Sequence, residues 1–240
     1  MWGLCKKELI QFFSSLSGYI AIAVFLLVNG LVLFVFEDNI LDFGYASLDR
    51  FFELAPWILL LLIPAITMRS FAEEFRTGTY EILATQPLQK TQIILGKYAS
   101  ALIVVLIALV PTFLYAFTVN ALAAGEGIDR GATMGSYVGL FFLAAVFTAI
   151  GIWCSSLTSN TVVSFLLALL ASVIIYYGFN AISQLPVVSS GFDYWIEWLG
   201  IDFHYRSISR GVVEFTDLIY FMSLIALFFV FTARNLQQRS

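Results

Sequence analysis

The chain has 240 residues, of which 60% are hydrophobic and only 12% are charged, whereas an ordinary soluble domain is roughly 25% charged. This small number of charged side chains could not cover such a large apolar surface in water. The composition therefore predicts a protein that lies mostly in lipid. The formal net charge of -4 gives no indication of a nucleic-acid partner, because the charges are confined to a few loops.

The amino-terminal segment mixes apolar side chains with Lys6 and Lys7 over residues 6–18. This pattern predicts a short interfacial helix on the inner leaflet, with its lysines toward the headgroups. The alternative, that it extends the first transmembrane helix, stays open. The apolar run over 9–36 exceeds the roughly 7 to 15 residues of a secretory signal core, so we expect it to remain as a membrane anchor.

The uncharged stretches of the sequence predict six transmembrane helices, since one span needs about 20 residues. The stretch 131–192 is long enough for two spans, and the polar residues 154–160 within it are typical of a tight turn. No stretch shows the period-two alternation of a β-barrel. The expected fold is an all-α membrane protein with one transmembrane domain over 1–240, and its spans lie near 18–36, 52–68, 98–121, 136–155, 161–182 and 218–233.

The loop between the second and third spans has a helical charge pattern. Arg69, Glu73 and Arg76 follow one another at spacings of four and three, which places opposite charges on one helix face. Gly78 can end this helix, residues 79–83 can form a second short turn, and Pro87 marks the return toward the third span.

The segment between the fifth and sixth spans, 183–217, is long for a connection and rich in aromatic and acidic side chains. Such a mixture favours an interfacial or re-entrant helix at the outer surface. The residues concerned are Phe192, Asp193, Tyr194, Trp195, Glu197 and Trp198.

The Lys and Arg residues predict the orientation. With six spans, eight of them fall on the side of the two termini and four on the other, so the termini are expected in the cytoplasm. The eight are Lys6, Lys7, Arg69, Arg76, Lys90, Lys97, Arg234 and Arg239, and the four are Arg50, Arg130, Arg206 and Arg210.

The sequence lacks the residues that catalysis would need. Its one histidine, His204, is expected on an outer loop, which excludes a zinc motif or a Ser-His dyad within the membrane. Gly96-Lys97 is no phosphate-binding loop, because Thr91 stands where that motif has a glycine. Cys5 and Cys154 have no metal-type spacing and are expected as free thiols. We therefore expect a non-enzyme without catalytic, cofactor or metal sites.

No ionisable residue falls inside the six expected spans, and an ion-coupled carrier or channel would usually need one. An ATP-independent carrier is therefore disfavoured. The energy for any transport is expected to come from another protein.

The loop over 69–97 resembles the first cytoplasmic loop of ABC-2 type transporter permeases. In both, a Glu-rich helix, a Gly-Thr pair, a Glu, a Pro and a Gly-Lys follow in this order, here Gly78-Thr79, Glu81, Pro87 and Gly96-Lys97. Lys6-Lys7-Glu8-Leu9 ahead of an aromatic pair resembles the family's interfacial helix, and residues 210–221 resemble the segment that leads its sixth span. The likeness covers the whole chain and is nearest to the permease subunits of gliding-motility transporters.

The resemblance implies a permease subunit of the bacterial inner membrane that forms half of a substrate path. A second permease subunit, identical or different, would supply the other half, and a separate ABC ATPase would bind and hydrolyse ATP. The loop would carry the coupling helix that docks on the ATPase, through Glu73, Glu74, Arg76, Thr79 and Glu81. The alternative that stays open is a non-transport scaffold or anchoring subunit of a surface machine.

Overall fold

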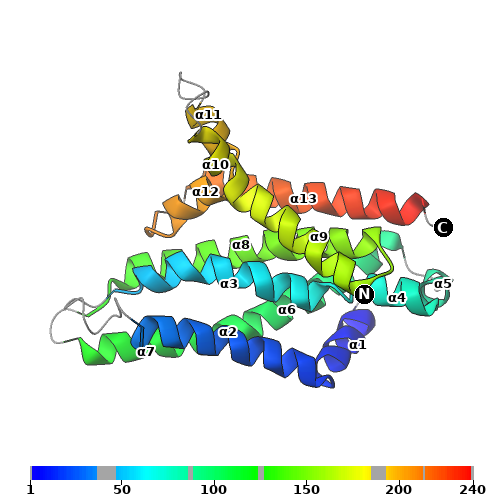
Figure 1. Ribbon diagram of the computed structural model, residues 1–240, viewed down its shortest axis with the longest axis horizontal. Coiled ribbons are helices and arrows are strands. Elements are labelled where there is room, and N and C mark those ends of the chain that lie inside the picture. The colour runs from blue at the N-terminus through cyan, green and yellow to red at the C-terminus, as the bar shows by residue number, and fades with distance from the viewer. Residues whose placement is uncertain are drawn as a thin grey trace.

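The computed structural model describes residues 2–36, 47–85, 89–123, 127–184, 193–212 and 214–238. Within these ranges all regular structure is helical and no strand occurs (Figure 1). The prediction of an all-α membrane protein is therefore confirmed. Pro87 and the aromatic residue Phe192 fall outside the described residues.

Five helical stretches are long and apolar enough to cross a membrane, and a sixth is reached if α1 and α2, which meet at a bend of 72°, count as one span. Two of the stretches are interrupted. A short 3-10 turn that contains Pro111 breaks Lys90–Leu122, and a π-helix breaks Thr161–Ser183. The segments are α1 (Trp2–Phe13) with α2 (Leu16–Phe34), α3 (Asp49–Thr67), α6 (Lys90–Leu109) with η1 (Val110–Thr112) and α7 (Phe113–Leu122), α8 (Arg130–Leu157), α9 (Thr161–Val173) with η2 (Ile174–Gly178) and α10 (Phe179–Ser183), and α13 (Phe215–Gln238).

Four short helices complete the described chain: α4 (Ala72–Thr77), α5 (Thr79–Ala84), α11 (Asp193–Trp198) and α12 (Ile201–Ile208). The amino terminus, α1, α4, α5 and the end of α13 lie at one end of the molecule, called here the terminal end (Figure 1). The beginnings of α3 and α8 and the helix α12 lie toward the other end, called the opposite end.

Helix α8 forms the centre of the bundle, and most of its side chains are buried from Ser136 to Ser156. Its glycines allow this close packing, as is common where membrane helices meet. A Cβ on Gly139 would lie 2.7 Å from Ile208 Cγ2 in α12, and one on Gly151 would overlap the Thr67 hydroxyl in α3. Small residues on α8 therefore set how near its neighbours can come.

The predicted turn after α8 is present. The helix ends at Leu157, and α9 begins after Asn160, whose Oδ1 accepts hydrogen bonds from the backbone N–H groups of Val162 (2.9 Å) and Val163 (3.4 Å). This side chain satisfies two donors that the first turn of a helix leaves unpaired. The polar run in the sequence thus marks a helix cap between two spans.

We expect Gly151→Ala to destabilise the protein, because the added methyl group forces α3 away from α8 at Thr67. Overpacking of this kind costs about 1 to 3 kcal/mol. The temperature of unfolding in detergent measures it. Gly3→Ala is the matched control, since a Cβ there has no atom within 4 Å. Equal unfolding temperatures for the two variants would contradict the packing described for α8.

Candidate functional site

The loop between the second and third spans folds into two short helices that meet at Gly78. This residue has φ 70°, a left-handed conformation that favours glycine. It ends α4 and begins α5, as the sequence predicted. The Thr77 and Thr79 hydroxyl groups lie 2.9 Å apart across the junction. The two helices form one compact hairpin, called here the α4–α5 unit.

The α4–α5 unit is fixed to the end of α8 by Ser155. The Ser155 hydroxyl oxygen accepts hydrogen bonds from the backbone N–H groups of Phe71 (3.0 Å) and Ala72 (3.1 Å) at the beginning of α4. It also donates to the Met68 carbonyl oxygen at 3.2 Å. A small apolar core also packs the unit against the rest of the protein. It is formed by Leu4, Phe71, Tyr80, Leu83, Ile93, Ile94, Ile152 and Leu236. The loop is therefore a packed part of the fold.

A buried lysine lies at the centre of this end of the molecule. Lys97, in α6, is 1% exposed, and its ammonium group lies 2.9 Å from Glu8 Oε1 in α1 and 2.8 Å from Glu74 Oε1 in α4. It also donates to the Ser70 carbonyl oxygen at 2.6 Å and lies 5.1 Å from the centroid of the Phe71 ring. One cation thus joins three elements, and this group of residues is called the Lys97 cluster.

The Lys97 cluster has a specific energetic requirement. A buried ammonium group is tolerated when carboxylates and hydrogen-bond acceptors surround it, but removing one partner leaves an uncompensated charge. The Glu8 and Glu74 side chains are only 17% and 11% exposed, so water screens them little. Helix α6 begins at Lys90, so it extends beyond the expected third span of 98–121, and Lys97 lies within the helix and not in a loop before it.

The five residues predicted to dock the ATPase divide into two groups. Glu74 points inward to Lys97, and Glu73 is half-buried and pairs with Arg76 at 3.6 Å. Arg76, Thr79 and Glu81 are exposed on the outside of the α4–α5 unit. The sequence analysis missed the supporting residues Glu8, Lys97 and Ser155. In the sequence, Lys97 stands directly before an apolar run, and this pattern is equally typical of an ordinary span boundary.

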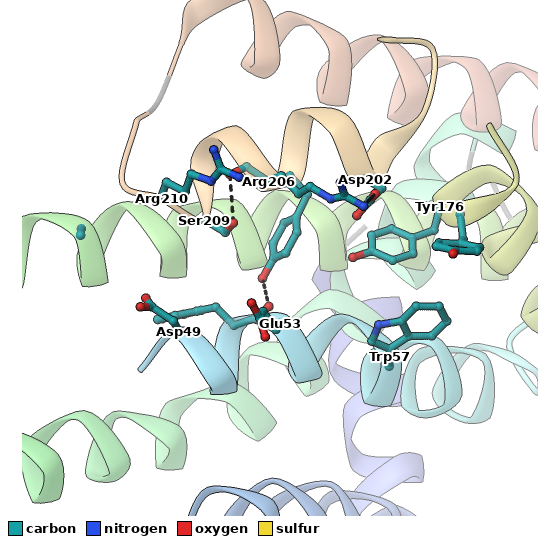
Figure 2. Close-up of a pocket in the computed structure, with 12 residues that line it drawn as sticks. Asp49, Glu53, Trp57, Tyr176, Asp202, Arg206, Ser209 and Arg210 are labelled. Carbon is teal, nitrogen blue, oxygen red and sulfur yellow. Dashed lines mark hydrogen bonds and ion pairs between the residues drawn. The ribbon is translucent and has the colours of Figure 1, made fainter. Parts of the chain in front are cut away.

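A cavity of about 750 Å³ lies at the opposite end, between α3 and α12 (Figure 2). Charged and aromatic side chains from α3, α12 and the π-helix η2 line it. They include Asp49, Glu53, Trp57, Tyr176, Tyr177, Asp202, Tyr205, Arg206 and Arg210. No group of three or more His, Cys, Asp or Glu side chains within the described residues is arranged to hold a metal ion.

His204 was expected on an outer loop, and this was wrong: it lies in α12 and is 1% exposed. Its Nδ1 is 2.7 Å from Asp217 Oδ1 in α13, and its Nε2 donates to the Trp198 carbonyl oxygen at 2.9 Å. The ring also stacks on Tyr220, with centroids 3.9 Å apart. The imidazole therefore ties α12 to the sixth span.

Tyr205, the next residue in α12, ties this helix to α3. Its hydroxyl group donates to the Phe52 carbonyl oxygen at 2.7 Å. Burial raises the pKa of Tyr205 well above its ordinary value, with smaller contributions from Tyr176 and Asp202. The group therefore stays protonated and keeps donating at any physiological pH.

We expect Lys97→Met to destabilise the protein by roughly 3 to 5 kcal/mol, because the largely buried Glu8 would lose its cation and the buried Glu74 would keep only the 3.9 Å contact with Lys7. The matched control is Lys6→Met, an exposed lysine of α1, which should change stability by about 0.5 kcal/mol or less. Adding Glu8→Gln and Glu74→Gln to Lys97→Met should recover part of the loss. Unfolding temperatures in detergent measure all three, and a Lys97→Met protein as stable as Lys6→Met would contradict the cluster.

No curated protein matches the chain at a significant level. The protein family described as ABC-2 family transporter protein matches residues 2–191, which is most of the chain. The chain therefore belongs to the ABC-2 transporter family.

Proposed function

We propose that the chain is the permease subunit of an ABC transporter, which forms half of a substrate path and couples to a separate ATPase subunit. The observation that carries this proposal is the α4–α5 unit. It presents Arg76, Thr79, Glu81 and the 66% exposed Ile82 outward, while Glu74 on its inner face is held by Lys97. A charged rim beside an exposed apolar side chain is a suitable docking surface for another protein.

The inner attachments of the α4–α5 unit give a route for coupling. A push on its outer face passes through Glu74 and Lys97 to α6, and through the same ammonium group to Glu8 in α1. Binding of ATP to the partner would then move the interfacial helix and the third span together. ATP would bias the transporter between two openings through its differential contact with this unit.

The terminal end is cytoplasmic in this proposal, and the membrane is the bacterial inner membrane. Eight of the 12 Lys and Arg residues lie on that side by the predicted topology, in agreement with the positive-inside rule. A second permease subunit completes the path. The likeness of the loop and of both ends of the sequence to gliding-motility permeases suggests a transporter of that kind.

We expect Glu81→Lys and Arg76→Glu each to lower the recovery of the ATPase strongly. Both reverse an exposed charge at the proposed contact, where a lost charge partner costs roughly 2 to 5 kcal/mol. The measurement is co-purification of the ATPase with membrane-inserted protein at fixed salt.

Two further variants sharpen this experiment. Glu214→Lys, on an exposed residue of the opposite end, should leave ATPase recovery unchanged. Glu74→Lys should lower stability as well as docking, since it places a second cation beside Lys97. Full ATPase recovery with both Glu81→Lys and Arg76→Glu would exclude this face as the docking site.

The orientation gives a second test. Single cysteines introduced near Asp42, Gly127 and Ser190 should react with an impermeant thiol reagent in intact cells, and those near Thr77 and Gln237 should react only after the membrane is opened. The native Cys5 and Cys154 are buried and give little background. The reverse pattern would place the α4–α5 unit outside the cell and remove the docking proposal.

A further inference from the structure

The cavity at the opposite end has a row of side chains along α3 as one wall. Asp49, Glu53 and Trp57 follow one another at intervals of four residues, which places them on one face of the helix. The row covers about 12 Å along the helix at 1.5 Å per residue. It therefore runs from two carboxylates at the beginning of α3 to an indole ring farther along the span.

The facing wall has a row with the same interval. Asp202, Arg206 and Arg210 begin on α12 and continue into the turn after it. The two rows run in opposite directions, so that Arg210 faces Asp49 and Arg206 faces Glu53 across the cavity (Figure 2). A wall with two carboxylates thus lies opposite a wall with two guanidinium groups and the carboxylate of Asp202, which pairs with Arg206.

These opposite charges do not neutralise each other. No ion pair joins the two walls in the described parts of the chain, and Arg206 is held by Asp202 on its own helix at 2.5 Å. The side chains of Asp49, Glu53 and Arg210 have neither an ion pair nor a hydrogen bond among the described residues. The cavity therefore offers a cation site and an anion site at a fixed separation.

The walls are held apart by the fold, so the cavity is preformed. Tyr205 bonds α12 to the Phe52 carbonyl oxygen, and His204 bonds it to Asp217 in α13. On its other side, Ile208 packs against Gly139 of α8. A helix with three such attachments cannot close freely on α3. A ligand with charges of both signs would instead pair with each wall, as binding sites that are largely preformed allow.

The position of the cavity near the ends of candidate spans indicates which chemical groups its ligand carries. The cavity lies near the beginnings of α3 and α8 and beside η2, which interrupts the fifth candidate span. The ends of membrane spans meet the lipid headgroups. π-helical breaks are frequent at functional sites, and Tyr176 and Tyr177 from this break lie next to Trp57. Aromatic faces beside carboxylates attract ammonium groups, and Arg binds phosphate through its planar fork.

We propose that this cavity binds a zwitterion in which an ammonium group and a phosphate group lie close together, of the phosphoethanolamine type found in phospholipid headgroups. The ammonium group lies between Asp49, Glu53 and the partly exposed ring of Trp57. The phosphate group lies against Arg206 and Arg210. This site is separate from the ATPase contact, so its test does not depend on the partner subunit.

The test measures binding of radiolabelled dihexanoyl phosphatidylethanolamine to the purified full chain in maltoside detergent. We expect saturable binding, and roughly tenfold weaker binding of dihexanoyl phosphatidylglycerol, which keeps the phosphate but lacks the ammonium group. Free O-phosphoethanolamine distinguishes the two sources of this chemistry. If it binds as tightly as the lipid, the ligand is a soluble zwitterion; if it competes only weakly, the acyl chains contribute and the ligand is a lipid.

Variants connect the binding to the two walls. Glu53→Gln and Arg210→Gln should each weaken binding roughly tenfold, the loss of one contact to a charged group. Glu214→Gln and Arg130→Gln are matched controls at the same end, both exposed and outside the cavity, and should bind as the native chain does. Arg210→Lys, which keeps the charge but loses the planar fork, should bind more tightly than Arg210→Gln and less tightly than the native chain. Unfolding temperatures check that every variant is folded.

Three results would overturn the proposal. The first is binding of phosphatidylglycerol as tight as that of phosphatidylethanolamine. The second is native affinity in both Glu53→Gln and Arg210→Gln. The third is no saturable binding of either the lipid or O-phosphoethanolamine.

Discussion

The terminal end of this protein depends on one buried ammonium group. Lys97 is 1% exposed, and its charge is balanced by carboxylates from α1 and α4 and by the Ser70 carbonyl oxygen. Because a buried cation is costly without its partners, α1, the α4–α5 unit and α6 must assemble together. The loop expected to meet the ATPase is thereby built into the membrane domain.

Helix α8 links this end to the other. Near its last turn, Ser155 accepts the first N–H groups of α4, and nearer its beginning Gly139 receives Ile208 of α12. The helix has 28 residues and so extends about 42 Å. One deeply buried helix therefore supports both the proposed docking surface and the wall of the cavity.

The sequence predicts the elements of this fold better than their contacts. The apolar runs, the polar turn within 154–160 and the helix end at Gly78 are local signals. The structure ends α4 at Gly78, and it has the turn at 158–160, because α8 continues to Leu157. Lys97 was missed because dividing the sequence at its charges places every charge outside a span. Glu73 and Glu74 are adjacent, and only the packing of α4 decides which of them points toward Lys97. That Asp49 lies opposite Arg210 depends on the tertiary fold and could not be predicted, because the two residues lie far apart in the sequence.

The central claim is that the Lys97 cluster makes α1 and the α4–α5 unit move as one body. The most direct measurement is the distance between spin labels at the exposed positions Lys6 and Ile82, in the complex with the ATPase, with and without trapped ATP. The account predicts an unchanged distance in the native background, and a distance that changes with nucleotide when Lys97→Met, Glu8→Gln and Glu74→Gln remove the three charges together. A distance that changes equally with nucleotide in both backgrounds would contradict it.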